Sequence, residues 1–324
     1  MNPSLTRRRF ALTAAAALAT TRLPAQSTPS AGSIEHDHIL ADAALALKAH
    51  PVALLDVSAA VAALTAAFVL TKDETYARAA ESHLNRWLPA PISTLTTPPT
   101  VVSLIPIAEL ARSTSFLIDL IDPTKINAWL VDCATWLTTA RDPVIARDTK
   151  DHRASAWLLI VSAIARSQRD ETLLDQCRHR LRTPTLRNQI DEVGRFPQEM
   201  ATPTPLRNTL FNFDLLFGAC QLLDSPFDPL WNYELVDGVG LRTVAAYLYP
   251  ILKDMRIWPG VADPDHFRDV PLRRPALLFA GRAFSRPEYI DLFRSLPTIV
   301  PAALAASVPI RQPLLWTTRA AHGL

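Results

Sequence analysis

The chain has 324 residues, of which 49% are hydrophobic and 20% are charged, a balance typical of globular proteins and not of disordered ones. It holds only 8 Gly against 27 Pro, and neither a GxGxxG nor a GxxxxGK[ST] pattern occurs, which argues against a Rossmann cradle and a P-loop. The formal net charge is +2, but residues 1–25 contain four arginines and no acid, so the rest of the chain carries −2. No basic surface for nucleic acid is expected.

Three cysteines, Cys133, Cys177 and Cys220, lie far apart and form no CxxC pair. This argues against a zinc ribbon and a disulfide framework, and leaves open buried thiols or one bridge. His36 and His38 flank Asp37, but a solvated start of the first helix explains them better than a metal site. We expect no metal and no other cofactor.

The N-terminus has the composition of an export signal. Arg7, Arg8 and Arg9 precede Phe10, the apolar run 11–19 and the small residue Ala25. Paired arginines before Phe resemble the twin-arginine type, which predicts a periplasmic or secreted protein cleaved near Ala25. The alternative is an amphipathic first helix. The apolar run is too short for a permanent membrane span, and residues 26–35 are predicted to be a flexible lead-in.

The remainder predicts helix after helix. Apolar spacing gives a helix over 36–49, a longer one over 55–70 with Asp56 or Ser58 as cap, and one opened by Asp73. An extended loop is expected over 89–100. Further helices are expected at 104–121, 124–140, 152–167, 170–183, 206–223, 240–253, 271–284 and 287–295.

These helices form about five pairs without a dividing linker, so a single domain over 36–324 is expected. A helical-repeat solenoid should show a repeated signature every 30–45 residues or so, and none is found. We therefore predict an all-α fold, an incomplete α/α toroid of paired antiparallel helices.

The first segment that could carry chemistry is Lys150-Asp151-His152, at the head of a predicted helix. His transfers protons near neutral pH, and Asp151 can orient it or cap the helix. The plainer interpretation is a helix cap followed by an exposed first-turn histidine.

Two further segments combine polar and aromatic residues. The first runs over 194–200 and 207–214, where Asn212 within an apolar stretch is either a structural clamp or a cleft residue. The second runs over 228–249, where Trp231 and Tyr247 suit sugar rings but are more common in cores. No HExxH or GxSxG motif is present.

In this order, the segments resemble the alginate lyase family. The residues that carry the resemblance are Ala66–Ala77, Trp87-Leu88, Trp136–Thr139 with Asp151-His152, Phe196–Met200 with Phe211–Asp214, and Leu230–Tyr233 with Leu241-Arg242. The resemblance implies an α/α toroid that cleaves uronate polysaccharides by β-elimination, with a polysaccharide or oligosaccharide as partner.

The resemblance assigns His152 as the catalytic residue. Asp151 stands where the family has Asn, and Lys150 where a preceding Asn is frequent. Ungapped alignment from Pro197-x-Glu199 puts Thr202 at the family's Arg position and Asn208 at its Tyr position, and neither can transfer a proton or carry charge.

The neighbouring Arg207 can replace the lost cation, and Asn212 completes the expected substrate contacts. Two functions remain: a lyase with a rearranged site, or an inactive lyase-like domain that binds a glycan or protein partner in the same cleft.

Overall fold

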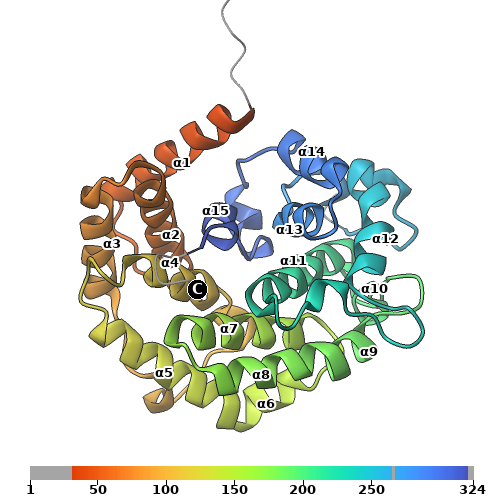
Figure 1. The fold of residues 1–324 in the computed structure, drawn as a ribbon, viewed down its shortest axis with the longest axis horizontal. Helices are drawn as coiled ribbons and strands as arrows, with labels where there is room; N and C mark the ends of the chain where they lie inside the picture. Colours follow the sequence, from red (N-terminus) through yellow and green to blue (C-terminus); the bar gives the residue numbers. More distant parts are fainter. Residues whose placement is uncertain (1–30, 265–266, 320–324) are drawn as a thin grey trace, which may run out of the picture.

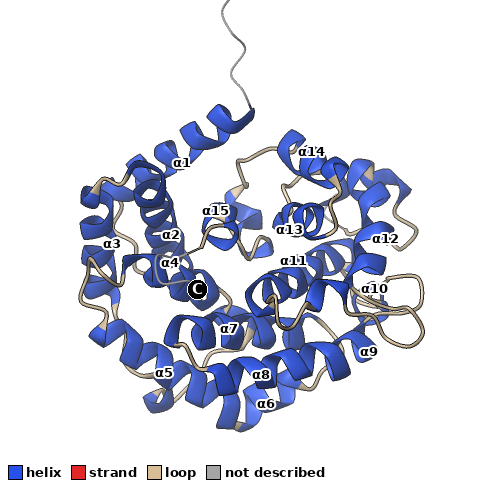
Figure 2. Cartoon of the chain, viewed as in Figure 1, coloured by secondary structure: helices blue, strands red, loops and turns tan. Residues whose placement is uncertain are grey.

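The computed structural model describes residues 31–264 and 267–319, and within these ranges the regular structure is helical, with two isolated β-bridges and no named strand (Figure 2). The longer helices are α1 (Ala31–Lys48), α2 (Leu54–Thr71), α3 (Glu74–Trp87), α4 (Pro106–Leu117), α5 (Thr124–Thr139), α7 (His152–Gln168), α8 (Glu171–Arg180), α11 (Pro205–Leu223), α12 (Leu241–Lys253), α13 (Pro275–Ala283) and α14 (Pro287–Ser295). The shorter ones are α6 (Arg141–Arg147), α9 (Leu186–Gln189), α10 (Pro197–Met200) and α15 (Pro313–Thr317).

The helices form an open ring of two layers (Figure 1). Helices α2, α4, α7, α11 and α13 make the inner layer, each packed against the next along the chain, and α1, α3, α5, α8, α12 and α14 lie outside them. The ring of helices is incomplete between α1 and α14 (Figure 1), and Glu35 and His38 of α1 contact Arg273 and Thr298 across this gap. The predicted all-α, incomplete α/α toroid is confirmed.

The C-terminal segment occupies the centre of the ring, where α15 lies between α2, α4 and α11 (Figure 1). Two buried side chains of α4 hold it. The guanidinium of Arg112 donates to the carbonyl oxygens of Leu315 and Thr318 at 2.8 and 2.6 Å. The carboxylate of Glu109 accepts the backbone N–H groups of Arg311 and Gln312. The end of the described chain therefore packs against an inner helix formed two hundred residues earlier.

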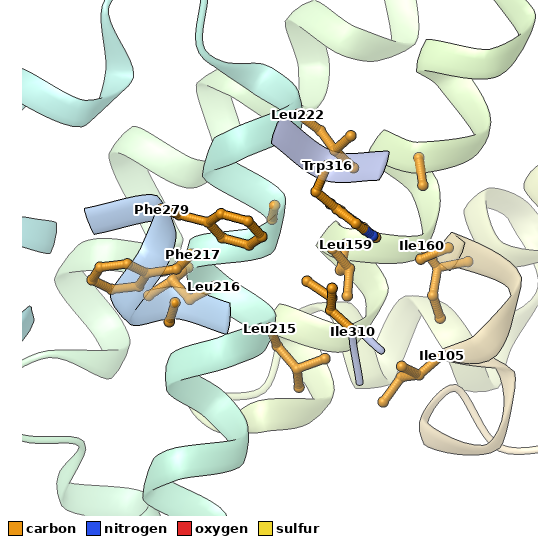
Figure 3. Packing of buried hydrophobic residues seen from close by; sticks show 14 of the residues in the cluster. Ile105, Leu159, Ile160, Leu215, Leu216, Phe217, Leu222, Phe279, Ile310 and Trp316 are labelled. Atoms are coloured by element: carbon orange, nitrogen blue, oxygen red, sulfur yellow. The ribbon is translucent and has the colours of Figure 1, made fainter. Parts of the chain in front are cut away.

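The core follows the inner layer. Figure 3 shows Leu159 of α7, Leu215 of α11 and Phe279 of α13 packed around Ile310 and Trp316 of the C-terminal segment. Gly218 permits this approach, because a Cβ atom there would lie 2.6 Å from the side chain of Ile310. Burial of these apolar side chains is the main stabilising contribution in the centre of the ring.

Helix α2 is long and apolar enough to cross a membrane by length and composition alone. In the structure most of it is buried against α1, α3 and α4, as expected of a core helix.

Several local expectations are corrected. Helix α1 begins at Ala31, inside the expected flexible lead-in 26–35. Neither Asp56 nor Ser58 caps α2, whose N-cap is Ala53; the Ser58 hydroxyl instead donates to the carbonyl oxygen of Pro106 and ties α2 to α4. The short helices α6, α9, α10 and α15 were not predicted, because four to seven residues hold too little periodic signal. The expected leader, residues 1–25, lies outside the described residues.

Candidate functional site

The head of α7 is fixed by Asp151. Its side chain caps the helix by accepting the backbone N–H of Arg153 at 3.0 Å and the hydroxyl of Thr149 at 2.8 Å. It also pairs with the Arg153 guanidinium, at 2.7 Å from Nη2 to Oδ2. Burial alone would raise the pKa of Asp151, but these hydrogen bonds outweigh it and the pKa is lowered. Asp151 thus positions the residue that follows it.

That residue, His152, pairs with Glu199 of α10 and not with Asp151. Its Nδ1 lies 3.0 Å from Oε2 and 3.2 Å from Oε1 of Glu199, and its backbone N–H donates to the same carboxylate. Glu199 is fully buried, whereas 21% of the His152 side chain is exposed. Two contacts with one buried carboxylate hold both the ring and the start of α7.

This pairing assigns the imidazole proton to Nδ1, because a carboxylate oxygen can only accept a hydrogen bond and Nδ1 must therefore donate it. The other nitrogen, Nε2, then carries a lone pair, and no described residue is its hydrogen-bond partner. The Phe211 ring meets the imidazole edge-on, with centroids 5.8 Å apart, and limits its rotation. An oriented imidazole with one free nitrogen is suited to general base catalysis.

Glu199 was not predicted as a site residue, although the Pro197-x-Glu199 motif contributed to the resemblance. The sequence signal that could have identified it is a glutamate two residues after Pro197, in the first turn of a short helix.

Thr202 and Asn208 lie in the same corner as Glu199. The Thr202 hydroxyl donates to the carbonyl oxygen of Glu199 at 2.6 Å and accepts a hydrogen bond from Asn208 Nδ2 at 3.0 Å. Thr204 adds a longer contact to Asn208 Oδ1. The two positions where the resemblance expects Arg and Tyr thus hold a neutral, hydrogen-bonded pair beside Glu199.

Arg207 is directed elsewhere. Its backbone N–H donates to the buried carboxylate of Asp263 at 2.9 Å, and its guanidinium lies 4.9 Å from the Phe267 ring. Lys150, by contrast, is exposed two residues before His152 and has no ion-pair partner among the described residues.

Of the two interpretations of Asn212, the structure favours the structural clamp over the cleft residue. It is fully buried, and its Nδ2 donates to Gln189 Oε1 at 2.9 Å. The Ser155 hydroxyl donates to the same Gln189 oxygen, so one amide links α7, α9 and α11 beneath the site. A ligand cannot reach Asn212 without separating these helices.

The third predicted segment serves packing. Trp231 is 7% exposed and lies between the rings of Phe217 and Phe284, with centroids 5.5 and 5.6 Å away. The Arg242 guanidinium lies 4.6 Å from the centre of the Phe284 ring. The core interpretation of Trp231 therefore holds in the structure.

Comparison with known proteins agrees with the fold and the order of these segments. The alginate lyase family model matches residues 19–258, a range that begins inside the expected leader. A crystal structure of an alginate lyase from Bacteroides ovatus is similar in fold, with a TM-score of 0.66 over 82% of this chain and 74% of that one. The two sequences are 20% identical, so the likeness bears on fold alone. No curated protein matches.

Proposed function

The chain belongs to the alginate lyase family, and on that premise we propose that it is an exported polysaccharide lyase with a rearranged active site, acting on a uronate-containing glycan. The observation that carries the proposal is the His152–Glu199 pair, which leaves one imidazole nitrogen available at the head of α7. The coarser description, a polysaccharide lyase-like protein, follows from family and fold.

The reaction is β-elimination. His152 Nε2 removes the proton at C5 of the uronate, the C–H electron pair forms the C4=C5 double bond, and the C4–O glycosidic bond breaks. A cation near the uronate carboxylate makes the C5 proton more acidic. Lys150 is an exposed cation two residues before His152, and unlike Arg153, which pairs with Asp151, it has no ion-pair partner among the described residues. It takes this role in our proposal in preference to Arg207.

The departing oxygen needs a proton. Thr202 and Asn208 cannot supply it near neutral pH, so the protonated His152 returns the proton it has taken. One residue can serve both steps only where the C5 proton and the C4 oxygen lie on the same face of the sugar. Mannuronate and glucuronate have this geometry, and guluronate, the C5 epimer of mannuronate, does not.

The test is a panel of polymannuronate, polyguluronate and polyglucuronate, followed by the ultraviolet absorbance of the unsaturated product. His152→Ala should abolish cleavage of polymannuronate. Glu199→Gln should lower it about ten- to hundredfold, because a charge-assisted hydrogen bond to the base is lost. His179→Ala, which changes an exposed histidine of α8, is the matched control and should retain full activity. Equal activity of the His152→Ala variant and the wild type would refute the proposal.

The second candidate function is glycan binding without cleavage, and the neutral Thr202–Asn208 pair favours it. It would be supported by affinity for polymannuronate with no unsaturated product from any polymer in the panel.

Export is proposed from the sequence pattern Arg7-Arg8-Arg9-Phe10 and the apolar run after it. The protein is then expected in the periplasm or the medium after fractionation of producing cells. Arg8→Lys with Arg9→Lys should retain it in the cytoplasm, and unchanged export of that variant would exclude the twin-arginine route.

A further inference from the structure

A cavity with a polar lining lies beside α11 and includes neither His152 nor Glu199. It encloses about 220 Å³ between the end of α12, the segment 268–274 and Leu296, with Leu210 of α11 in its wall. None of its lining residues is a hydrogen-bond or ring partner of His152 or Glu199. Most of the lining lies beyond residue 258, where the family match ends.

The lining is rich in basic side chains. Lys253, Arg256, Arg268 and Arg274 outnumber two acids of the lining, Asp254 and Asp269, and the buried Asp214 that pairs with Arg274 leaves a formal excess of one positive charge. Asp254 is already engaged by Arg256, with Nε–Oδ1 and Nη2–Oδ2 distances of 2.7 and 2.9 Å. A small cavity with excess positive charge favours an anion.

Arg274 gives the cavity a built floor. Its side chain is 1% exposed, and its Nη1 donates to Asp214 at 3.2 Å and to the carbonyl oxygen of Ser307 at 3.0 Å. Its Nε and Nη2 are buried and have no hydrogen-bond partner. Buried guanidinium N–H groups without partners are costly, and they point to an acceptor that is absent from the protein itself.

The rim is different in character. Lys253, Arg256 and Arg268 are exposed, and the Arg256 side chain is 80% accessible. Exposed cations at the mouth attract an anion, and the buried guanidinium of Arg274 carries two nitrogens that have no hydrogen-bond partner.

We propose that this cavity binds the carboxylate of a single uronate residue as a secondary glycan subsite, with Arg274 at the floor and Arg268 at the rim. The anion chemistry stands on the cavity alone, whereas the choice of a uronate rests on the proposed function. The volume is smaller than the roughly 300–1,000 Å³ of sites for larger ligands, which restricts the occupant to about one sugar unit.

The experiment measures equilibrium binding of sodium mannuronate to the full chain by calorimetry, without reference to cleavage. The wild type should bind mannuronate and not the neutral methyl mannoside. Arg274→Lys keeps a charge beside Asp214 but removes the planar fork, and should weaken binding about tenfold. Arg268→Ala, at an exposed position that does not threaten folding, should weaken it about threefold and reduce its salt dependence.

Arg187→Ala, at an exposed arginine of α9, is the matched control and should bind as the wild type does. His152→Ala should also retain binding, so that failure of the lyase proposal and failure of this one are separate results. The inference is overturned if the wild type binds no mannuronate, if Arg274→Lys and Arg268→Ala bind normally, or if His152→Ala alone abolishes binding. Binding of inorganic phosphate in place of mannuronate would likewise reject a uronate subsite.

Discussion

The carboxylate of Glu109 and the backbone N–H of Gln312 meet at 2.7 Å although 203 residues separate them in sequence. Glu109 also accepts the N–H of Arg311 at 2.8 Å, so one buried side chain of α4 fixes the start of α15. Burial raises the pKa of Glu109 to about 7, despite these two hydrogen bonds and the nearby Arg311 charge.

This pKa predicts the pH dependence of stability. Because the folded pKa lies above the ordinary 4.5, the folded state holds a proton that the unfolded state has released, and stability decreases as pH rises from about 4.5 to about 7. The full effect is about 3 kcal/mol. Glu109→Gln keeps an acceptor oxygen and should flatten the loss between pH 5 and pH 8, as measured by urea unfolding. An equally steep loss in the variant would contradict the assignment.

Asp151 offers a test of the α7 cap. Asp151→Ala should lower the free energy of unfolding by about 1–2 kcal/mol, because the N–H of Arg153 loses its acceptor. Asp151→Asn, which restores the family's residue, keeps the cap and should cost less than about 1 kcal/mol for the exposed Arg153 pair. Chemical denaturation of both variants measures the two free energies of unfolding. An equal decrease in both variants would show that the ion pair and not the cap stabilises the helix.

Gly194 lies in a turn of the loop before α10, where the loop backbone packs against the start of α12. Its φ is +93°, and a Cβ atom there would lie 2.5 Å from the backbone oxygen of Thr243. Gly194→Ala should therefore lower the free energy of unfolding by more than about 3 kcal/mol, because backbone strain and the steric clash act together.

Gly238 is the matched control for this substitution. It has a similar φ of +81° but nothing within 4 Å of its Cβ position, so Gly238→Ala should cost only the strain, about 1–2 kcal/mol. Thermal unfolding that ranks the two variants in the opposite order would show that α12 moves away from the loop at little cost.

The three cysteines should be inert in the folded protein. Cys133, Cys177 and Cys220 are buried and unbridged, and burial raises the pKa of Cys177 to about 12 and that of the other two as well. A thiol reagent should label none of them at pH 8 and all three in urea. Labelling of one site in the native state would reveal local opening there.

The helices and their order were predictable because the apolar spacing of the long segments is helical, and because Asp73 and Asp151 cap α3 and α7. The central position of the C-terminal segment was not predictable from the sequence. The contacts of Glu109 and Arg112 that hold it are made with backbone groups about two hundred residues away. Backbone partners leave no trace in side-chain patterns.

The candidate site was predicted in part. His152 and its helix head follow from local sequence, but its partner Glu199 lies 47 residues on, in a four-residue helix. Arg207 and Asn212 were predicted as site residues because of their functional groups. Successive side chains of α11 are rotated by about 100° around its axis, so the position of a residue along the helix decides whether its side chain reaches the surface. Asn212 faces Gln189 inside the protein, and Arg207 faces Phe267.

The position of the C-terminal segment at the centre of the ring has a consequence for biosynthesis. Inner helices α2 and α4 leave the ribosome long before residues 311–318, so until those residues appear the charges of Glu109 and Arg112 have no lasting partners. A nascent chain is thus kept from reaching its final fold early, and the closing step waits for residues that are synthesised about two hundred positions after α4.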